Sequence, residues 1–106
     1  MIDIVTIRQK VNKDEYAFVG HAIVEGRKDD ITPRDVRHVL LNGEIIEEYP
    51  ERYRCLVLGH TDDSIPVHVT LEFCDWLEAP DQDIVIVTVY IPDRARWFRN
   101  HKRKRA

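Results

Sequence analysis

The sequence predicts an α+β fold in which N-terminal helices pack on one face of a three- to four-stranded antiparallel sheet. Before residue 43, apolar residues recur at helical spacing, whereas afterwards they alternate with polar residues. Turn-forming stretches such as TDDS and EAPDQD separate the alternating runs. Helices followed by strands are typical of an α+β domain and not of repeated βαβ units.

Two helices are predicted near the N-terminus. The spacing of Ile4, Ile7 and Val11 indicates a short opening helix. A longer helix is predicted from residue 14 to residue 27, and its apolar positions are Tyr16, Val19, Ala22 and Ile23. His21 falls roughly opposite this apolar arc, because each helical residue turns the side-chain direction by about 100°.

The third predicted helix, in the segment ITPRDVRHVLLNG, has signals at both ends. Thr32 is a good N-cap, Pro33 suits the first helical position, and Asp35 completes a weak capping box. Gly43 marks the C-terminal end. The apolar stripe of this helix consists of Val36, Val39 and Leu40.

Strands are predicted in the segments EIIEEYP, YRCLVLGHT, PVHVTLEFC and DIVIVTVYIP, of which the first is short. A turn centred on Asp62 and Asp63 joins the second strand to the third and places Val57 opposite His68. A loop one residue longer would reverse the faces of this pairing. For the last strand, the pattern predicts one face with Val85, Val87, Val89 and Ile91 and another with Thr88 and Tyr90.

The segment IPVHVTLEF carries a histidine on the reverse of an apolar face. His68 alternates with Val67 and Val69, so it belongs to the face away from the helices, which an antiparallel sheet can leave open to solvent. The residues predicted to support it on this open face are Thr70, Glu72, Thr88 and Tyr90. A lone histidine there is most simply a solvated strand residue. The gathering of donors, acceptors and a titratable imidazole favours a functional surface.

Composition indicates one domain, residues 1–93, followed by a basic aromatic tail or short helix, residues 94–106. The tail holds seven Lys or Arg and no acid, so its formal charge is +7 against −10 for the rest of the chain. No apolar run approaches the about 20 residues of a transmembrane helix, and no secretory signal is visible. A cytoplasmic location without membrane contact is therefore expected. Cys55 and Cys74 are predicted to be buried thiols and not a disulfide.

Three stretches, NGEIIEEYP, PVH and VTVYIP, carry a resemblance to a family of small prokaryotic domains of unknown function. The resemblance covers about residues 20–92. The recurrent positions of the family pattern correspond to His21, Gly43, Glu44, Tyr49, Gly59, His68, Thr88, Tyr90 and Pro92. Its members are often encoded beside a zinc-finger antitoxin of the YgiT or MqsA type and are similar to the RelE, ParE and BrnT toxins. The resemblance implies a RelE-like fold and the toxin component of a type II toxin–antitoxin system.

A RelE-like toxin implies a metal-independent endoribonuclease that acts on messenger RNA, with or without the ribosome. In such an enzyme a base removes the 2′-hydroxyl proton, the oxygen attacks phosphorus, and a cation stabilises the pentacovalent charge. His68 is assigned as base or acid, and Tyr90 as proton donor or stacking ring. Arg94 or Arg96 is assigned as the stabilising cation. His21 joins this catalytic set if its helix reaches the rim of the sheet.

The tail segment RWFRNHKRKR interleaves aromatic rings with cations, a pattern that suits stacking on bases and pairing with phosphates. The predicted RNA-binding residues are Arg96, Trp97, Arg99, Lys102, Arg103, Lys104 and Arg105. A frayed terminus is the simpler alternative. No cofactor is expected, and no metal site is predicted, because the histidines and cysteines lack ligand spacing on a single element.

Two functions follow from these patterns. The first is the toxin-type ribonuclease, which the basic aromatic tail favours. The second is a non-enzymatic, toxin-like binding module that pairs with a zinc-finger partner, which the acidic body favours. The segment EGRKDD also favours the second, because relatives tend to carry arginines where this chain has Glu25 and Asp29.

Overall fold

The computed structural model describes residues 2–73 and 82–103. Its helices are α1 (Ile4–Asn12), α2 (Gly20–Lys28), α3 (Pro33–Asn42) and the 3-10 helix η1 (Pro50–Arg52). Its strands are β1 (Tyr16–Phe18), β2 (Glu44–Tyr49), β3 (Arg54–His60), β4 (Pro66–Glu72), β5 (Ile84–Tyr90), β6 (Trp97–Phe98) and β7 (Lys102–Arg103). Within these residues, no helix has the length and apolar character to cross a membrane.

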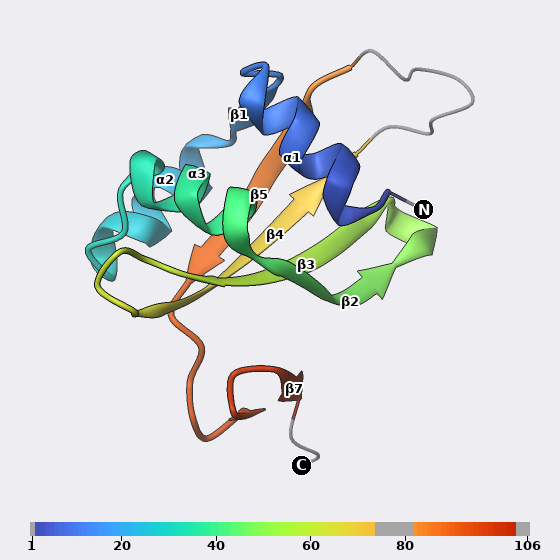
Figure 1. Ribbon diagram of the computed structural model, residues 1–106. Coiled ribbons are helices and arrows are strands. Elements are labelled where there is room, and N and C mark those ends of the chain that lie inside the picture. Colours follow the sequence, from blue (N-terminus) through green and yellow to red (C-terminus); the bar gives the residue numbers. More distant parts are fainter. Residues whose placement is uncertain (1, 74–81, 104–106) are drawn as a thin grey trace.

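A five-stranded mixed sheet forms the centre of the fold, in the order β1-β5-β4-β3-β2. β1 runs parallel to β5, and the other neighbours are antiparallel. The three α-helices lie on one side of the sheet, and the short β6–β7 hairpin lies on the opposite side (Figure 1). The predicted α+β class is confirmed, but the sheet is neither purely antiparallel nor limited to three or four strands.

The predicted helix over residues 14–27 is wrong in its first half. Asp14 has a left-handed φ of 58° just after α1, and Tyr16–Phe18 then forms β1, which pairs with the segment from Ile84 to Ile86. A strand of three residues is too short to display an alternating pattern, so the apolar residues around it are read at helical spacing. The unpaired edge of β5 supplies the hydrogen bonds that make this segment extended.

The third helix forms as predicted, with a complete capping box. The Asp35 amide donates to the Thr32 hydroxyl over 3.1 Å, and the Thr32 amide donates to the Asp35 carboxylate over 2.9 Å. Pro33 occupies the first turn, where its missing N–H costs nothing. The buried residues of this helix are those of the predicted stripe, Val36, Val39 and Leu40.

The β3–β4 pairing differs by one residue from the predicted register. Leu58 lies opposite His68, and Leu56 lies opposite Thr70, so the predicted pairing of Val57 with His68 is wrong. The connecting loop is residues 61–65, one residue longer than a turn centred on 62 and 63 allows. As a result Val57 belongs to the core, and the two leucines belong to the face away from the helices.

A bulge in the β4–β5 pairing explains the irregular apolar pattern of the last strand. The register shifts between Thr70 and Leu71, so that Ile86 pairs with Leu71 although Thr88 pairs with Thr70. The buried core residues of β5 are Ile84, Ile86 and Val89. The predicted single face of Val85, Val87, Val89 and Ile91 is therefore wrong, because the bulge changes the alternation in mid-strand. A second shift lies between Ile45 and Glu47 in β2.

Two glycines allow α3 to approach β3 closely. A Cβ on Gly59 would lie 2.7 Å from the Val39 carbonyl oxygen and 2.7 Å from the Val39 Cγ1. A Cβ on Gly43 would lie 2.6 Å from the Leu58 carbonyl oxygen. Backbone atoms cannot move aside as flexible side chains do, so both positions require glycine. Both are among the recurrent positions of the resemblance described above.

The Gly59→Ala substitution is expected to lower the free energy of unfolding by about 1–3 kcal/mol, because the new methyl group overlaps the α3 backbone. Gly20→Ala serves as the matched control, since no atom lies within 4 Å of its Cβ position. It is expected to be neutral or stabilising by up to about 1 kcal/mol. Urea unfolding measures both. Equal stability of the two variants would contradict the close approach.

Cys55 is a buried free thiol in β3, on the core side of the sheet. Burial, and then the nearby Glu48 carboxylate, raise the pKa of its thiol from 9.0 to about 12. The neutral thiol is thus favoured in the folded protein. This contribution to stability is complete below pH 9 and is lost as the pH rises toward 12. Cys74 lies outside the described residues, so its predicted burial is untested.

Above pH 9 the free energy of unfolding is expected to fall by about 1.4 kcal/mol per pH unit on account of Cys55. Cys55→Ala should remove this part of the slope. Denaturant unfolding at pH 8, 9 and 10 measures the free energy of unfolding of both proteins. Groups other than Cys55 titrate alike in the two proteins, so their effect cancels in the difference. Parallel slopes for the two proteins would mean that the thiol ionises alike in the folded and unfolded chains.

Candidate functional site

Polar residues from neighbouring strands meet on the side of the sheet away from the helices, here called the outer face. His68 in β4 is flanked by Leu58 in β3 and Tyr90 in β5. The next row along the strands places Thr70 beside Thr88. The period-two pattern therefore predicted correctly that these polar side chains share one face. Glu72 follows on the same face and lies 3.7 Å from the Arg54 Nε atom.

His68 is completely buried, so the prediction that it is open to solvent is wrong. Its Nε2 lies 2.6 Å from the carbonyl oxygen of Asn100, and its Nδ1 lies 3.2 Å from the Tyr90 hydroxyl. The Trp97 ring packs edge to face on the imidazole at a centroid distance of 4.4 Å. The Tyr90 ring packs at 5.3 Å. The imidazole is enclosed by the C-terminal segment.

The partners of His68 determine its neutral tautomer. A carbonyl oxygen only accepts hydrogen bonds, so Nε2 carries the proton that it donates to Asn100. In the neutral ring Nδ1 then accepts from the Tyr90 hydroxyl. A buried imidazole with both nitrogens bonded satisfies the requirement that interior polar groups find partners. In this conformation the ring has no free nitrogen to offer a substrate.

The C-terminal segment reaches the outer face by turning back after Pro92. The Ala95 amide donates to the Asp93 carboxylate over 2.9 Å, which stabilises the turn. The β6–β7 hairpin follows, with left-handed φ values of 52° at Arg99 and 63° at Asn100. These residues direct the Asn100 carbonyl at His68. The hairpin also contacts the β2 edge, because His101 Nε2 lies 3.1 Å from the Glu44 carboxylate.

The structure brings together only part of the predicted site. Tyr90 contacts His68, whereas His21 lies on α2, on the helical side, with a side chain 73% exposed and 3.5 Å from the Glu25 carboxylate. His21 therefore does not join His68. Residues 94–103 form a turn and a hairpin, not the alternative short helix.

The predicted RNA-binding residues fall into three groups. Trp97 is buried, with 4% of its surface exposed, so its ring anchors the hairpin and is not available for stacking on a base. The exposed cations among them are Arg96, Arg99 and Lys102, and the catalytic candidate Arg94 is exposed as well. The side chain of Arg103 and the whole of Lys104 and Arg105 lie outside the described residues. Asn100 was not predicted as a partner of His68. Its only sequence signal is that asparagine tolerates the left-handed backbone conformation of a turn.

Two polar atoms of the outer face are buried and lack a hydrogen-bond partner among the described residues. They are the Thr88 Oγ1 and the Arg54 Nε. The described residues also contain no group of three or more His, Cys, Asp or Glu placed to hold a metal ion.

The chain belongs to a family described as a domain of unknown function, DUF4258, which matches residues 18–91. A comparison with curated proteins and a comparison with solved structures each gave no significant match. The matched region includes α2, α3 and β2–β5, with His68 and Tyr90. It ends before the turn and hairpin that cover His68. The residues that cover the imidazole therefore lie outside the matched region.

Removal of the imidazole is expected to loosen the hairpin. His68→Ala should lower the free energy of unfolding by about 2–4 kcal/mol, because it leaves a cavity and unpaired polar groups. In a Trp76→Phe background Trp97 is the sole tryptophan, and its emission should shift to longer wavelength as the ring meets water.

His21→Ala is the control for this experiment, since an exposed histidine is expected to change stability by less than about 0.5 kcal/mol. Chemical denaturation and emission spectra compare the two variants. An unchanged Trp97 spectrum in His68→Ala would show that the imidazole does not hold the hairpin.

Proposed function

We propose that the protein is the toxin component of a type II toxin–antitoxin pair and acts on messenger RNA in the cytoplasm. The observation that carries this proposal is the outer face itself: a hydrogen-bonded His68–Tyr90 pair beneath a hairpin with exposed cations. Imidazole and phenol can serve as the general base and general acid of a ribonuclease, and arginine suits phosphate.

The hairpin concentrates positive charge on an otherwise acidic protein. Arg94, Arg96 and Lys102 are exposed near one another in the chain, and Trp97 fixes their segment against the sheet. Charges are screened over about 8 Å at physiological salt, so a polyanion at the hairpin feels these cations, and the nearby carboxylates of Asp93 and Glu44, more than the other acids of the body.

Catalysis in this proposal requires the hairpin to move. His68 Nδ1, the ring nitrogen without a proton, would accept the 2′-hydroxyl proton after its hydrogen bond from the Tyr90 hydroxyl is broken, while O2′ attacks the adjacent phosphorus. The 5′-oxygen leaves with a proton from Tyr90 or the imidazolium, and a 2′,3′-cyclic phosphate remains. Arg94 or Arg96 would stabilise the pentacovalent charge. RNA binding along the hairpin would favour this displacement if the RNA binds more tightly to the form in which His68 is uncovered.

The second candidate function is a non-enzymatic, toxin-like module that pairs with a zinc-finger antitoxin of the YgiT or MqsA type. The observation that favours it is the closed state of His68, whose two nitrogens are both bonded within the chain. In this case the buried histidine is structural, and the outer face with its hairpin is a protein-binding surface.

A triple variant tests the RNA proposal without removing the hairpin. Arg94→Gln, Arg96→Gln and Lys102→Gln together should weaken RNA binding. The slope of log affinity against log salt should become shallower by up to about 2, since each single-strand phosphate contact contributes about 0.7. Fluorescence anisotropy with a labelled RNA over a salt series measures this. Truncation is unsuitable, because it would uncover His68.

The matched control carries Arg27→Gln, Lys28→Gln and Arg34→Gln on exposed positions of the helical side. It changes the net charge equally, so only the position of the charges differs.

Expression of the unaltered chain without a partner should also slow bacterial growth and deplete messenger RNA. Equal RNA binding by both triple variants would overturn the hairpin as the RNA surface, and normal growth at verified expression would favour the binding module.

A further inference from the structure

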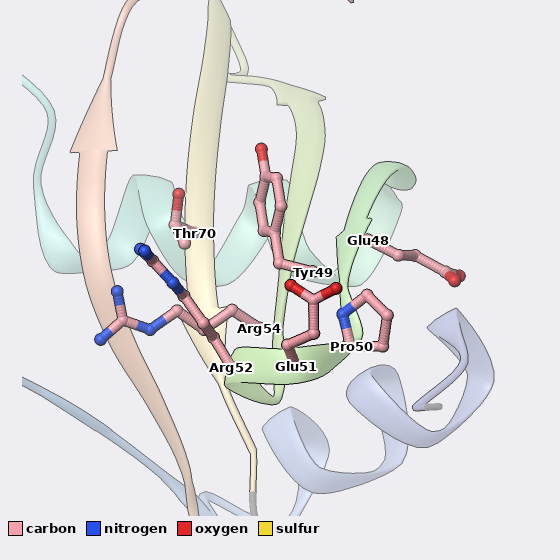
Figure 2. A pocket seen from close by; sticks show the side chains of 7 residues that line it. All are labelled: Glu48, Tyr49, Pro50, Glu51, Arg52, Arg54 and Thr70. Carbon is pink, nitrogen blue, oxygen red and sulfur yellow. The ribbon is translucent and has the colours of Figure 1, made fainter.

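A separate pocket opens where β2 and β3 are joined by η1. Its volume is about 400 Å³, within the range of small-ligand sites, and its lining residues are Glu48, Tyr49, Pro50, Glu51, Arg52, Arg54 and Thr70 (Figure 2). None of its lining residues belongs to the hairpin. The pocket is therefore accessible in the conformation in which His68 is covered.

The pocket combines groups that bind phosphate with groups that bind an aromatic base. The side chains of Arg52 and Arg54 extend toward the side of Thr70 in Figure 2, while the Tyr49 ring stands on the other side with the Glu51 carboxylate. Glu48 points away from the pocket. Two guanidinium groups thus face the interior together with one carboxylate, a phenol ring and a hydroxyl.

The turn at Tyr53, between Arg52 of η1 and Arg54 of β3, is stabilised by contacts with Phe73. Tyr53, between them, has a left-handed φ of 51°, and its carbonyl accepts a hydrogen bond from the Phe73 amide over 2.9 Å. Its ring also packs edge to face on Phe73 at 6.1 Å. An ordered backbone at this turn lowers the entropic cost of presenting the two side chains to a ligand.

The pocket is continuous with the outer face around His68. Thr70 lines the pocket and lies two residues along β4 from His68, on the same face. Thr88, opposite Thr70, has a buried hydroxyl with no partner among the residues that the structure describes. The Arg54 Nε is also buried and forms an ion pair with the Glu72 carboxylate at 3.7 Å, a distance too long for a hydrogen bond.

We propose that this pocket binds one nucleotide of a single-stranded RNA, with its phosphate on Arg52 and Arg54 and its base on the Tyr49 ring. Guanidinium groups bind phosphate with paired, charge-assisted hydrogen bonds. Unpaired bases stack on tyrosine rings, and their polar edges hydrogen-bond to groups such as the Glu51 carboxylate and the Thr70 hydroxyl. The choice of RNA as the polymer rests on the proposed function, whereas binding of a free nucleotide does not.

Nucleotide titration followed by heteronuclear NMR tests the pocket directly. Adenosine 5′-monophosphate should shift the backbone amide signals of Tyr49, Arg54 and Thr70. Inorganic phosphate alone and adenosine alone should bind more weakly, because each uses half of the site. Arg52→Gln and Arg54→Gln should each weaken nucleotide binding about tenfold, the loss of one charge-assisted bond.

Arg34→Gln is the control, since Arg34 lines a different hollow near α3. It should bind the nucleotide as the unaltered protein does, and the spectra confirm that each variant is folded. The proposal is overturned if the pocket amides do not respond to millimolar nucleotide, if both arginine variants bind normally, or if phosphate alone binds as tightly as the nucleotide. If the protein binds the nucleotide but the hairpin does not bind RNA, the nucleotide site is supported and the proposed ribonuclease function is contradicted.

Discussion

The burial of one imidazole determines how the C-terminal segment sits on the sheet. An interior histidine needs partners for both ring nitrogens, and His68 finds them in the Tyr90 hydroxyl and the Asn100 carbonyl. Tyr90 is supplied by the neighbouring strand, but Asn100 comes from 32 residues along the chain. The hairpin lies where it brings the Asn100 carbonyl to Nε2, and the Trp97 ring packs edge to face on the imidazole.

This arrangement gives the molecule a third layer. The helices cover one side of the sheet, and the hairpin covers part of the other, around His68 (Figure 1). The DUF4258 match includes the sheet residues of the site but ends at residue 91, before the covering layer. The segment that covers the His68–Tyr90 pair thus lies outside the matched residues. The arginine pocket beside Thr70 stays open and needs no such movement.

Local sequence signals predicted the parts of the fold that local physics determines. The capping box of α3 and the alternation of β4 were read correctly, because both depend on residues near one another in the chain. The short strand β1, the bulge in β5 and the covered state of His68 were missed, because each depends on a partner distant in sequence. Likewise, the shared face of the polar strand residues was predictable. The pocket was not predictable, because its lining residues come from β2, η1, β3 and β4 and meet only when the sheet has formed.

The irregular edge of the sheet affects how copies of the chain meet. β2 is the outermost strand on its side, with a register shift between Ile45 and Glu47 and carboxylates at Glu44, Glu47 and Glu48. A straight, uncharged edge is a template for adding strands from other molecules, and kinks and like charges both oppose such growth. The opposite edge, β1, offers only three residues. At both margins the sheet is therefore protected against extension into fibrillar aggregates.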